Sequence, residues 1–131
     1  MDPDFPYPRY DLGVVLKRTG RREEARAEFA KAAGLNPSFP WPAFDLGLLL
    51  LEDGAPGEAL PWFERACALD PNFPFFHFRR GEALAALGRA HEDRAAFARA
   101  LELKPGEERF LRALETLTPG SREAPAKEAA Q

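Results

Sequence analysis

The residues best suited to chemistry are few in this 131-residue chain. The two histidines are His77 and His91, and the one cysteine is Cys67. No carboxylate or thiol stands near the histidines at the spacing that binds a metal or activates a nucleophile. No glycine-rich phosphate loop is present. We therefore expect no catalytic residue, no metal ligand, no cofactor and no enzymatic activity, with His77 and Cys67 as packing residues.

Aromatic side chains recur at fixed spacing. Nine of the fifteen aromatics fall in three segments that follow one another at 34-residue intervals: Phe5, Tyr7 and Tyr10, then Phe39, Trp41 and Phe44, then Phe73, Phe75 and Phe78. Rings arranged in a row bind an apolar helix or grip an extended proline-rich segment. The other interpretation, which the sequence leaves open, is that the rings pack against neighbouring repeats inside the monomer.

The elements that would position these rings follow the same period. Counted from Pro6, Pro40 and Pro74, each period has Gly at places 8 and 15, Phe at place 24, Ala at place 27 and Pro at place 32. The prolines favour a first helical turn, and the second glycine favours a helix end in the left-handed conformation. Each period is therefore predicted to form a helix–turn–helix hairpin, with the upstream residues Asp4, Ser38 and Asn72 as candidate N-caps.

This pattern resembles the tetratricopeptide repeat, whose signature has Leu-Gly at places 7–8, Ala at 20, Phe at 24, Ala at 27 and Pro at 32. Repeat one supplies Leu12-Gly13, Ala25 and Phe29, and repeat two supplies the equivalent residues. The resemblance implies an all-α fold, with repeats 6–39, 40–73 and 74–107 stacked as a right-handed superhelix (an α-solenoid). It also implies a scaffold for protein–protein interaction.

A further helix is expected over residues 107–117. Phe110, Leu111, Leu114 and Leu117 form one helical stripe there. Such a helix covers the apolar face of a last repeat, because terminal units need a polar outer face. We predict one domain over residues 1–118 and a disordered tail over 119–131, which is small and polar.

In the family, places 2, 5, 9 and 12 of the first helix line the concave groove of the superhelix. The resemblance therefore implies a partner-binding groove, together with Arg79, the one nearby residue suited to a carboxylate: Tyr7, Tyr10, Val14, Trp41, Phe44, Leu48, Leu51, Phe75, Phe78 and Arg79. Members that bind chaperone C-termini hold the terminal carboxylate with Lys, Asn and Arg. Asp11 and Asp45 stand among the corresponding places here, so that mode is not expected.

Repeat three departs from the signature twice. Place 7 is Arg80 instead of Leu, and place 20 is Asp93 instead of Ala. In the family both places face the contact between the two helices of a hairpin. We predict that Arg80 and Asp93 form an ion pair, because a lone buried charge is costly. Exposure of both residues at an edge is the alternative.

The composition of the chain argues against two classes of binding partner, nucleic acids and membranes. The net charge of −3 argues against nucleic acid as a partner, and no apolar run is long enough for membrane insertion. A cytoplasmic location and a thermophilic bacterial source are expected, from the absence of a signal sequence in this chain and from the scarcity of amides. The expected partner is a protein or peptide. Two alternatives stay open: a homo-oligomer formed through the groove or the uncapped N-terminal repeat, and a docking part of a larger enzyme or secretion complex.

Overall fold

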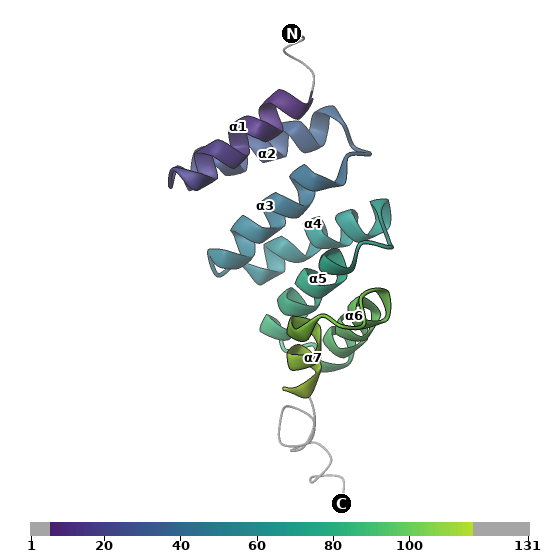
Figure 1. The fold of residues 1–131 in the computed structure, drawn as a ribbon. Coiled ribbons are helices and arrows are strands. Elements are labelled where there is room, and N and C mark those ends of the chain that lie inside the picture. Colours follow the sequence, from purple (N-terminus) through teal and green to yellow (C-terminus); the bar gives the residue numbers. More distant parts are fainter. Residues whose placement is uncertain (1–5, 117–131) are drawn as a thin grey trace, which may run out of the picture. The chain divides into compact units, whose positions relative to one another are not determined.

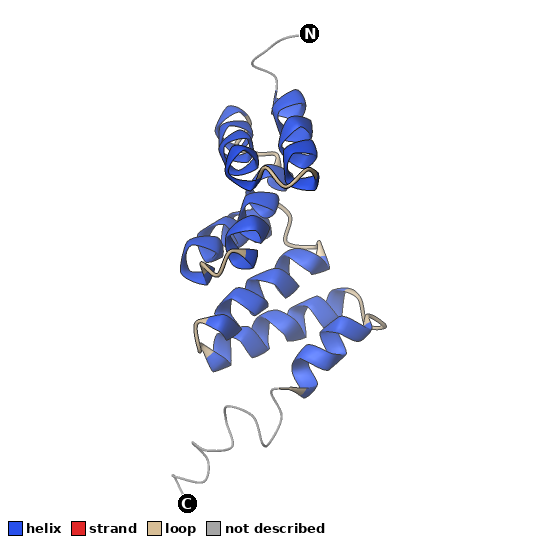
Figure 2. Cartoon of the chain, turned by 90° about the vertical axis from the view of Figure 1, so that its left-hand side faces the viewer, coloured by secondary structure: helices blue, strands red, loops and turns tan. Residues whose placement is uncertain are grey.

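The computed structural model describes residues 6–116, with side chains from residue 8 onward. In this part of the chain every regular element is a helix (Figures 1 and 2). The helices are α1 Pro6–Arg18, α2 Arg22–Leu35, α3 Pro40–Glu52, α4 Pro56–Leu69, α5 Pro74–Ala86, α6 Ala90–Leu103 and α7 Glu108–Glu115. The all-α prediction is confirmed. The predicted tail and the predicted cap Asp4 lie outside the described residues, and the single domain over 1–118 stays a prediction.

The chain divides into two compact units, Met1–Asp70 and Pro71–Gln131. In the first unit α1 packs on α2, α2 on α3, and α3 on α4 (Figure 1). In the second unit α5 packs on α6, and α6 on α7. Each predicted period therefore forms one hairpin, and α7 covers the last of them.

The turns inside the hairpins are made by the predicted glycines. Gly20, Gly54 and Gly88 have φ of 83°, 81° and 75°. This left-handed conformation strains any residue that carries a Cβ. The helix ends were therefore predictable from residue type alone.

The predicted N-caps were wrong where the structure describes them. The N-cap residues of α3 and α5 are Phe39 and Phe73, and neither side chain caps the helix. The hydroxyl of Ser38 instead donates to Oδ1 of Asn36 at 2.8 Å, which closes a local turn. Proline at the start of each helix lowers the need for a cap, because proline has no N–H to satisfy.

Each hairpin is held by a close contact between a glycine and a phenylalanine. A Cβ added to Gly47 would lie 2.7 Å from Cε1 of Phe63, and the other two hairpins repeat this contact. The ring of Phe63 is fully buried and has no room to retreat. The glycine at place 8 is therefore required by packing.

The first prediction concerns this contact. We expect Gly47→Ala to lower the free energy of unfolding by about 1–3 kcal/mol, because the new methyl group overlaps the buried ring. Gly34→Ala is the matched control: nothing lies within 4 Å of its would-be Cβ, and alanine is the better helix former by about 1 kcal/mol. Urea unfolding of the three proteins measures both effects. Equal stability of Gly47→Ala and the native chain would show that α3 and α4 can move apart to accommodate the methyl group at no cost.

Candidate functional site

The first unit contains a cleft of about 370 Å³ on the side of α1 that carries Tyr10 and Val14. Its lining residues come from three helices: Tyr10, Val14, Lys17 and Arg18 of α1, Phe29 of α2, and Asp45 of α3. Tyr10 and Val14 are two of the predicted groove residues. The cleft therefore lies where the resemblance expects a ligand, and it brings rings, an aliphatic side chain and both signs of charge together.

A hydrogen bond between neighbouring hairpins shapes this cleft. The hydroxyl of Tyr10 donates to Oδ2 of Asp45 at 2.5 Å. The Tyr10 ring lies 5.7 Å from the ring of Phe29 and 5.6 Å, edge-on, from that of Phe39. Tyr10 is thus held on three sides by groups from other elements, and its position does not depend on a ligand.

Burial governs the protonation of this pair. It raises the pKa of Asp45, while the hydrogen bond from Tyr10 and the charge of Lys17 oppose the rise. The pKa of Tyr10 is raised far above its ordinary value, first by burial and then by the bond to Asp45. The phenol therefore stays protonated at neutral pH and remains a donor to Asp45.

One end of α1 carries positive charge toward the cleft. Lys17 Nζ lies 3.8 Å from Oε1 of Glu52, so its charge is partly balanced. Arg22 pairs with Glu52 at 3.2 Å and with Asp53 at 2.7 Å, which ties α2 to the end of α3. Arg18 is exposed and has no ion pair within residues 6–116. Arg18 is thus a cation left available to a ligand.

The other predicted groove residues of the first unit differ in exposure. Phe44 is 7% exposed, and its ring lies 5.8 Å from that of Phe63, so it belongs to the core. Trp41 meets Phe44 edge-on at 5.9 Å and is half-buried, as are Leu48 and Leu51. The side chain of Tyr7 lies outside the described part. As partner-binding residues, all of these stay a prediction.

In the second unit, α7 covers the predicted aromatics. Phe110 of α7 is fully buried, and its ring lies 5.1 Å from that of Phe75 and 5.0 Å from that of Phe78. Phe78 is itself 6% exposed and belongs to the same cluster. Arg109 lies over the Phe75 ring at 4.6 Å. Here the interpretation as internal packing describes Phe75 and Phe78 well.

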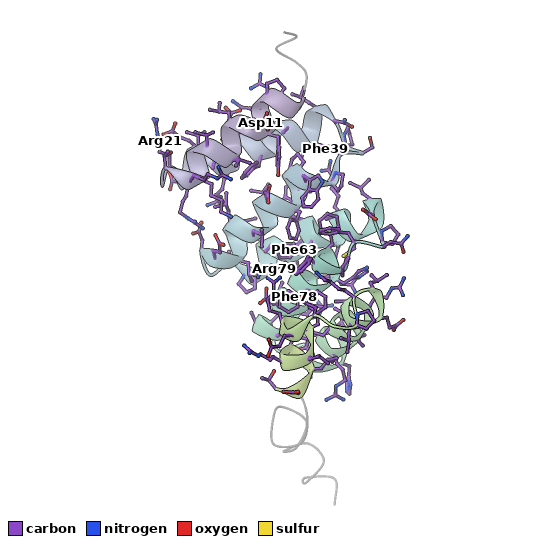
Figure 3. The ribbon with its side chains drawn as sticks, viewed as in Figure 1. Asp11, Arg21, Phe39, Phe63, Phe78 and Arg79 are labelled. Atoms are coloured by element: carbon purple, nitrogen blue, oxygen red, sulfur yellow. The ribbon has the colours of Figure 1, made fainter. Side chains whose placement is uncertain are left out.

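The charged residues of α5 are also engaged. Nη1 of Arg79 donates to Glu82 at 2.7 Å, and its guanidinium lies 5.4 Å from the ring of Phe78 (Figure 3). Asp93 is fully buried in α6, and Arg80 is half-buried on α5, the helix that packs on it. The predicted pair between Arg80 and Asp93 stays a prediction.

Sequence reasoning missed several lining residues. Phe29 was counted only as a signature residue of the repeat, Arg18 was not considered, and Asp45 was considered only as a charge that repels carboxylates. The signal for Asp45 was present: an Asp-Leu-Gly triplet occurs at Asp11 and again at Asp45, 34 residues later. A second cleft, of about 520 Å³ over α2, α3 and α4, was not expected either; its walls include Glu23, Glu58 and Trp62.

His77 is structural, as expected from the sequence. It is 7% exposed, and its Nε2 lies 2.7 Å from the carbonyl oxygen of Pro71. Nδ1 is buried and has no hydrogen-bond partner in the described part of the chain. Burial lowers the pKa of His77, and the charges of Arg80 and Arg99 act in the same direction, against the effect of the Pro71 carbonyl. The neutral ring, with its proton on Nε2, is the form that this site stabilises.

Comparisons with known proteins agree with this architecture. A family model described as "Tetratricopeptide repeat" matches residues 10–74 and 72–108. No helix within residues 6–116 is both long and apolar enough to cross a membrane. No curated protein sequence matches the chain.

Solved structures share the fold. The first such domain of Spaghetti (RPAP3), bound to the HSP90 peptide SRMEEVD, matches with TM-score 0.85 and 21% identity over 92% of this chain and 95% of that one. MamA (residues 41 to the end) from Desulfovibrio magneticus RS-1 matches with TM-score 0.84 and 25% identity over 98% and 71%. The type III secretion chaperone SycD of Yersinia enterocolitica, in complex with a peptide of the translocator YopD, matches with TM-score 0.79 and 21% identity over 85% and 90%.

The second prediction tests the bond between Tyr10 and Asp45. We expect Tyr10→Phe to raise the pKa of Asp45 further, because it removes the donor that favours the ionised carboxylate. The free energy of unfolding at neutral pH should fall by about 1–3 kcal/mol, because the half-buried carboxylate loses a partner. Carboxyl NMR titration and urea unfolding measure the two effects. An unchanged Asp45 pKa would mean that the bond does not form in solution.

The third prediction concerns pH. Because the folded state holds the pKa of His77 below its ordinary value of 6.5, the unfolded chain binds a proton first as the pH falls. His77 therefore contributes stability that is complete above pH 6.5 and is lost as the pH falls from there toward the folded pKa. His77→Gln should flatten the pH dependence of the unfolding free energy in that window. Identical profiles for His77→Gln and the native chain would contradict this account.

Proposed function

Because the chain belongs to the tetratricopeptide repeat family, we propose that it is a scaffold that binds a segment of a partner protein and performs no chemical step itself. The observation that carries this proposal is the cleft of the first unit, in which the bond between Tyr10 and Asp45 holds a ring in place beside Val14. A pre-formed site of this kind spends little free energy on ordering when a ligand binds.

The size of the cleft suits an anchor rather than a whole ligand. About 370 Å³ stands at the lower end of the range for ligand pockets. The rings of Tyr10 and Phe29, with Val14, would receive an apolar or aromatic side chain. The remainder of the bound segment would extend along α1 and α3, where Trp41, Leu48 and Leu51 keep part of their surface exposed. We propose a helix or an extended segment with one apolar anchor as the ligand.

The charges that line the cleft indicate where the ligand can carry an acidic residue. RPAP3 and SycD were both solved with peptides bound, and the first of these peptides, SRMEEVD, has three acidic residues among its last four. In the present cleft Asp45 lies beside the apolar floor and disfavours a carboxylate there. Arg18 and Lys17 favour an acidic residue only toward the end of α1. We therefore propose a ligand whose anchor is apolar and whose acidic residue, if it has one, lies beyond the anchor.

The expected cytoplasmic location and thermophilic source stay predictions, and so does the absence of nucleic acid among the partners. The acidic balance of residues 40–73, with six acidic residues and Arg65, supports that absence.

The fourth prediction tests the cleft directly. Peptides selected on the full chain from a displayed random library should bind at least about tenfold more weakly to Val14→Glu, a loss of about 1.4 kcal/mol. The new carboxylate would be placed among rings and beside Asp45. Leu35→Glu is the matched control, since it makes the same kind of change at an exposed position of α2. Thermal unfolding confirms that both variants fold. Selected peptides that bind Val14→Glu as tightly as the native chain would refute the cleft as the site.

A further inference from the structure

The outer face of α1 exposes apolar side chains at helical spacing. Leu12 is 46% exposed and Val15 is 54% exposed, the two highest values among the large hydrophobic residues of the described part. They are three residues apart and therefore lie on one side of the helix. Single exposed apolar residues need no explanation, whereas contiguous exposed apolar surface marks interaction sites, and Leu12 and Val15 are neighbours on one helix face.

Comparison with α3 shows that this face of α1 has the side chains of a face that packs against another helix. Leu46 and Leu49 stand 34 residues after Leu12 and Val15 and are only 5% and 0% exposed. The helix that carries them packs on α2. The same places that are buried in α3 are thus apolar and exposed in α1, so α1 has the side chains of a helix that packs against another helix.

Two opposite charges flank this apolar pair. Asp11 and Arg18 are exposed, and within residues 6–116 neither forms a hydrogen bond or an ion pair. Figure 3 shows the position of Asp11 on α1. They are seven residues apart, about two turns, so they lie on the same edge of the face. An acid and a base placed this way are self-complementary: in an antiparallel pair of identical helices, each acid comes opposite the base of the other copy.

We propose that the α1 face of Asp11, Leu12, Val15 and Arg18 pairs with the same face of a second copy of this chain. A two-fold axis near residues 14 and 15 places Asp11 opposite Arg18 of the partner subunit, and the reverse. The same arrangement brings Val15 close to the axis and Leu12 against the partner subunit's Val15. The contact is one helix wide, so it is smaller than a standard interface, and association at micromolar or higher concentration is expected.

The other end of the described chain lacks these features. Leu111 of α7 is 40% exposed, but the charges beside it are already satisfied, since Arg112 pairs with Glu108 at 2.9 Å. Phe110 and Leu114 of α7 face the core of the second unit. The observations therefore favour pairing between two α1 faces over pairing of α1 with α7. This inference goes beyond the proposed binding of a partner segment and does not depend on it, although both use Arg18, which also lines the cleft.

The experiment is charge reversal followed by mixing. Sedimentation equilibrium of the native chain over micromolar to sub-millimolar concentrations should show a monomer–dimer equilibrium. Asp11→Arg alone and Arg18→Asp alone should each associate roughly tenfold or more weakly, because like charges then face each other twice. An equimolar mixture of the two variants should associate again as a heterodimer, since one ion pair then has its native sense and the other forms with reversed signs. Glu64→Arg, at an exposed carboxylate of α4, is the control for Asp11→Arg, with the same change of charge, and should associate as the native chain does.

Each other outcome overturns the proposal. A native chain that stays monomeric throughout would mean that this face does not bind a second copy. A dimer that persists in both single variants would place the interface elsewhere. Loss of association in the variants without recovery in the mixture would exclude the antiparallel pairing of Asp11 with Arg18. Circular dichroism shows that each variant is folded before it is compared.

Discussion

In every hairpin a phenylalanine ring of the second helix lies against a glycine of the first. Cβ atoms added to Gly13, Gly47 and Gly81 would come within 2.5–2.7 Å of Phe29, Phe63 and Phe97. This approach sets how closely the two helices pack and how the first helix is rotated about its axis. Once the rotation is set, it decides which side chains of that helix enter the core and which face the next hairpin. The cleft and the exposed face of α1 both follow from it.

Within the first unit, this arrangement gives α1 two distinct surfaces. One surface carries Tyr10 and Val14 and, with Phe29 and Asp45, forms the cleft. The other carries Leu12 and Val15 and has no partner helix among the described residues of the unit. Asp45 shows how neighbouring hairpins are joined, because its carboxylate accepts the Tyr10 hydroxyl. The equivalent Asp11 in α1 has no hairpin before it among the described residues. The Asp-Leu-Gly sequence thus joins two hairpins at Asp45, whereas at Asp11 the same sequence leaves the carboxylate exposed.

The sequence was sufficient to predict the helices, because proline and glycine mark their ends chemically. It was less informative about the aromatics. Tyr10, Phe44 and Phe78 occupy the same place in three repeats, yet Tyr10 lines a cleft while Phe44 and Phe78 are buried. The difference comes from what lies opposite each ring, such as Phe110 of α7 against Phe78. A periodic pattern shows which side of a helix a residue occupies, but the residues that cover that side come from other elements. The N-cap prediction at Ser38 was wrong for a related reason, because its hydroxyl donates a hydrogen bond to the side chain of Asn36 instead of capping α3.

The central claim is that the cleft beside Tyr10 and Val14 receives the partner. Titration of the isotope-labelled full chain with a selected peptide, followed by amide and methyl NMR, tests it most directly. The account predicts the largest shift changes at Val14, at the Tyr10 ring and around Asp45, with saturation at one common affinity. Changes confined to α4, α6 or α7, with the cleft resonances unmoved, would contradict it.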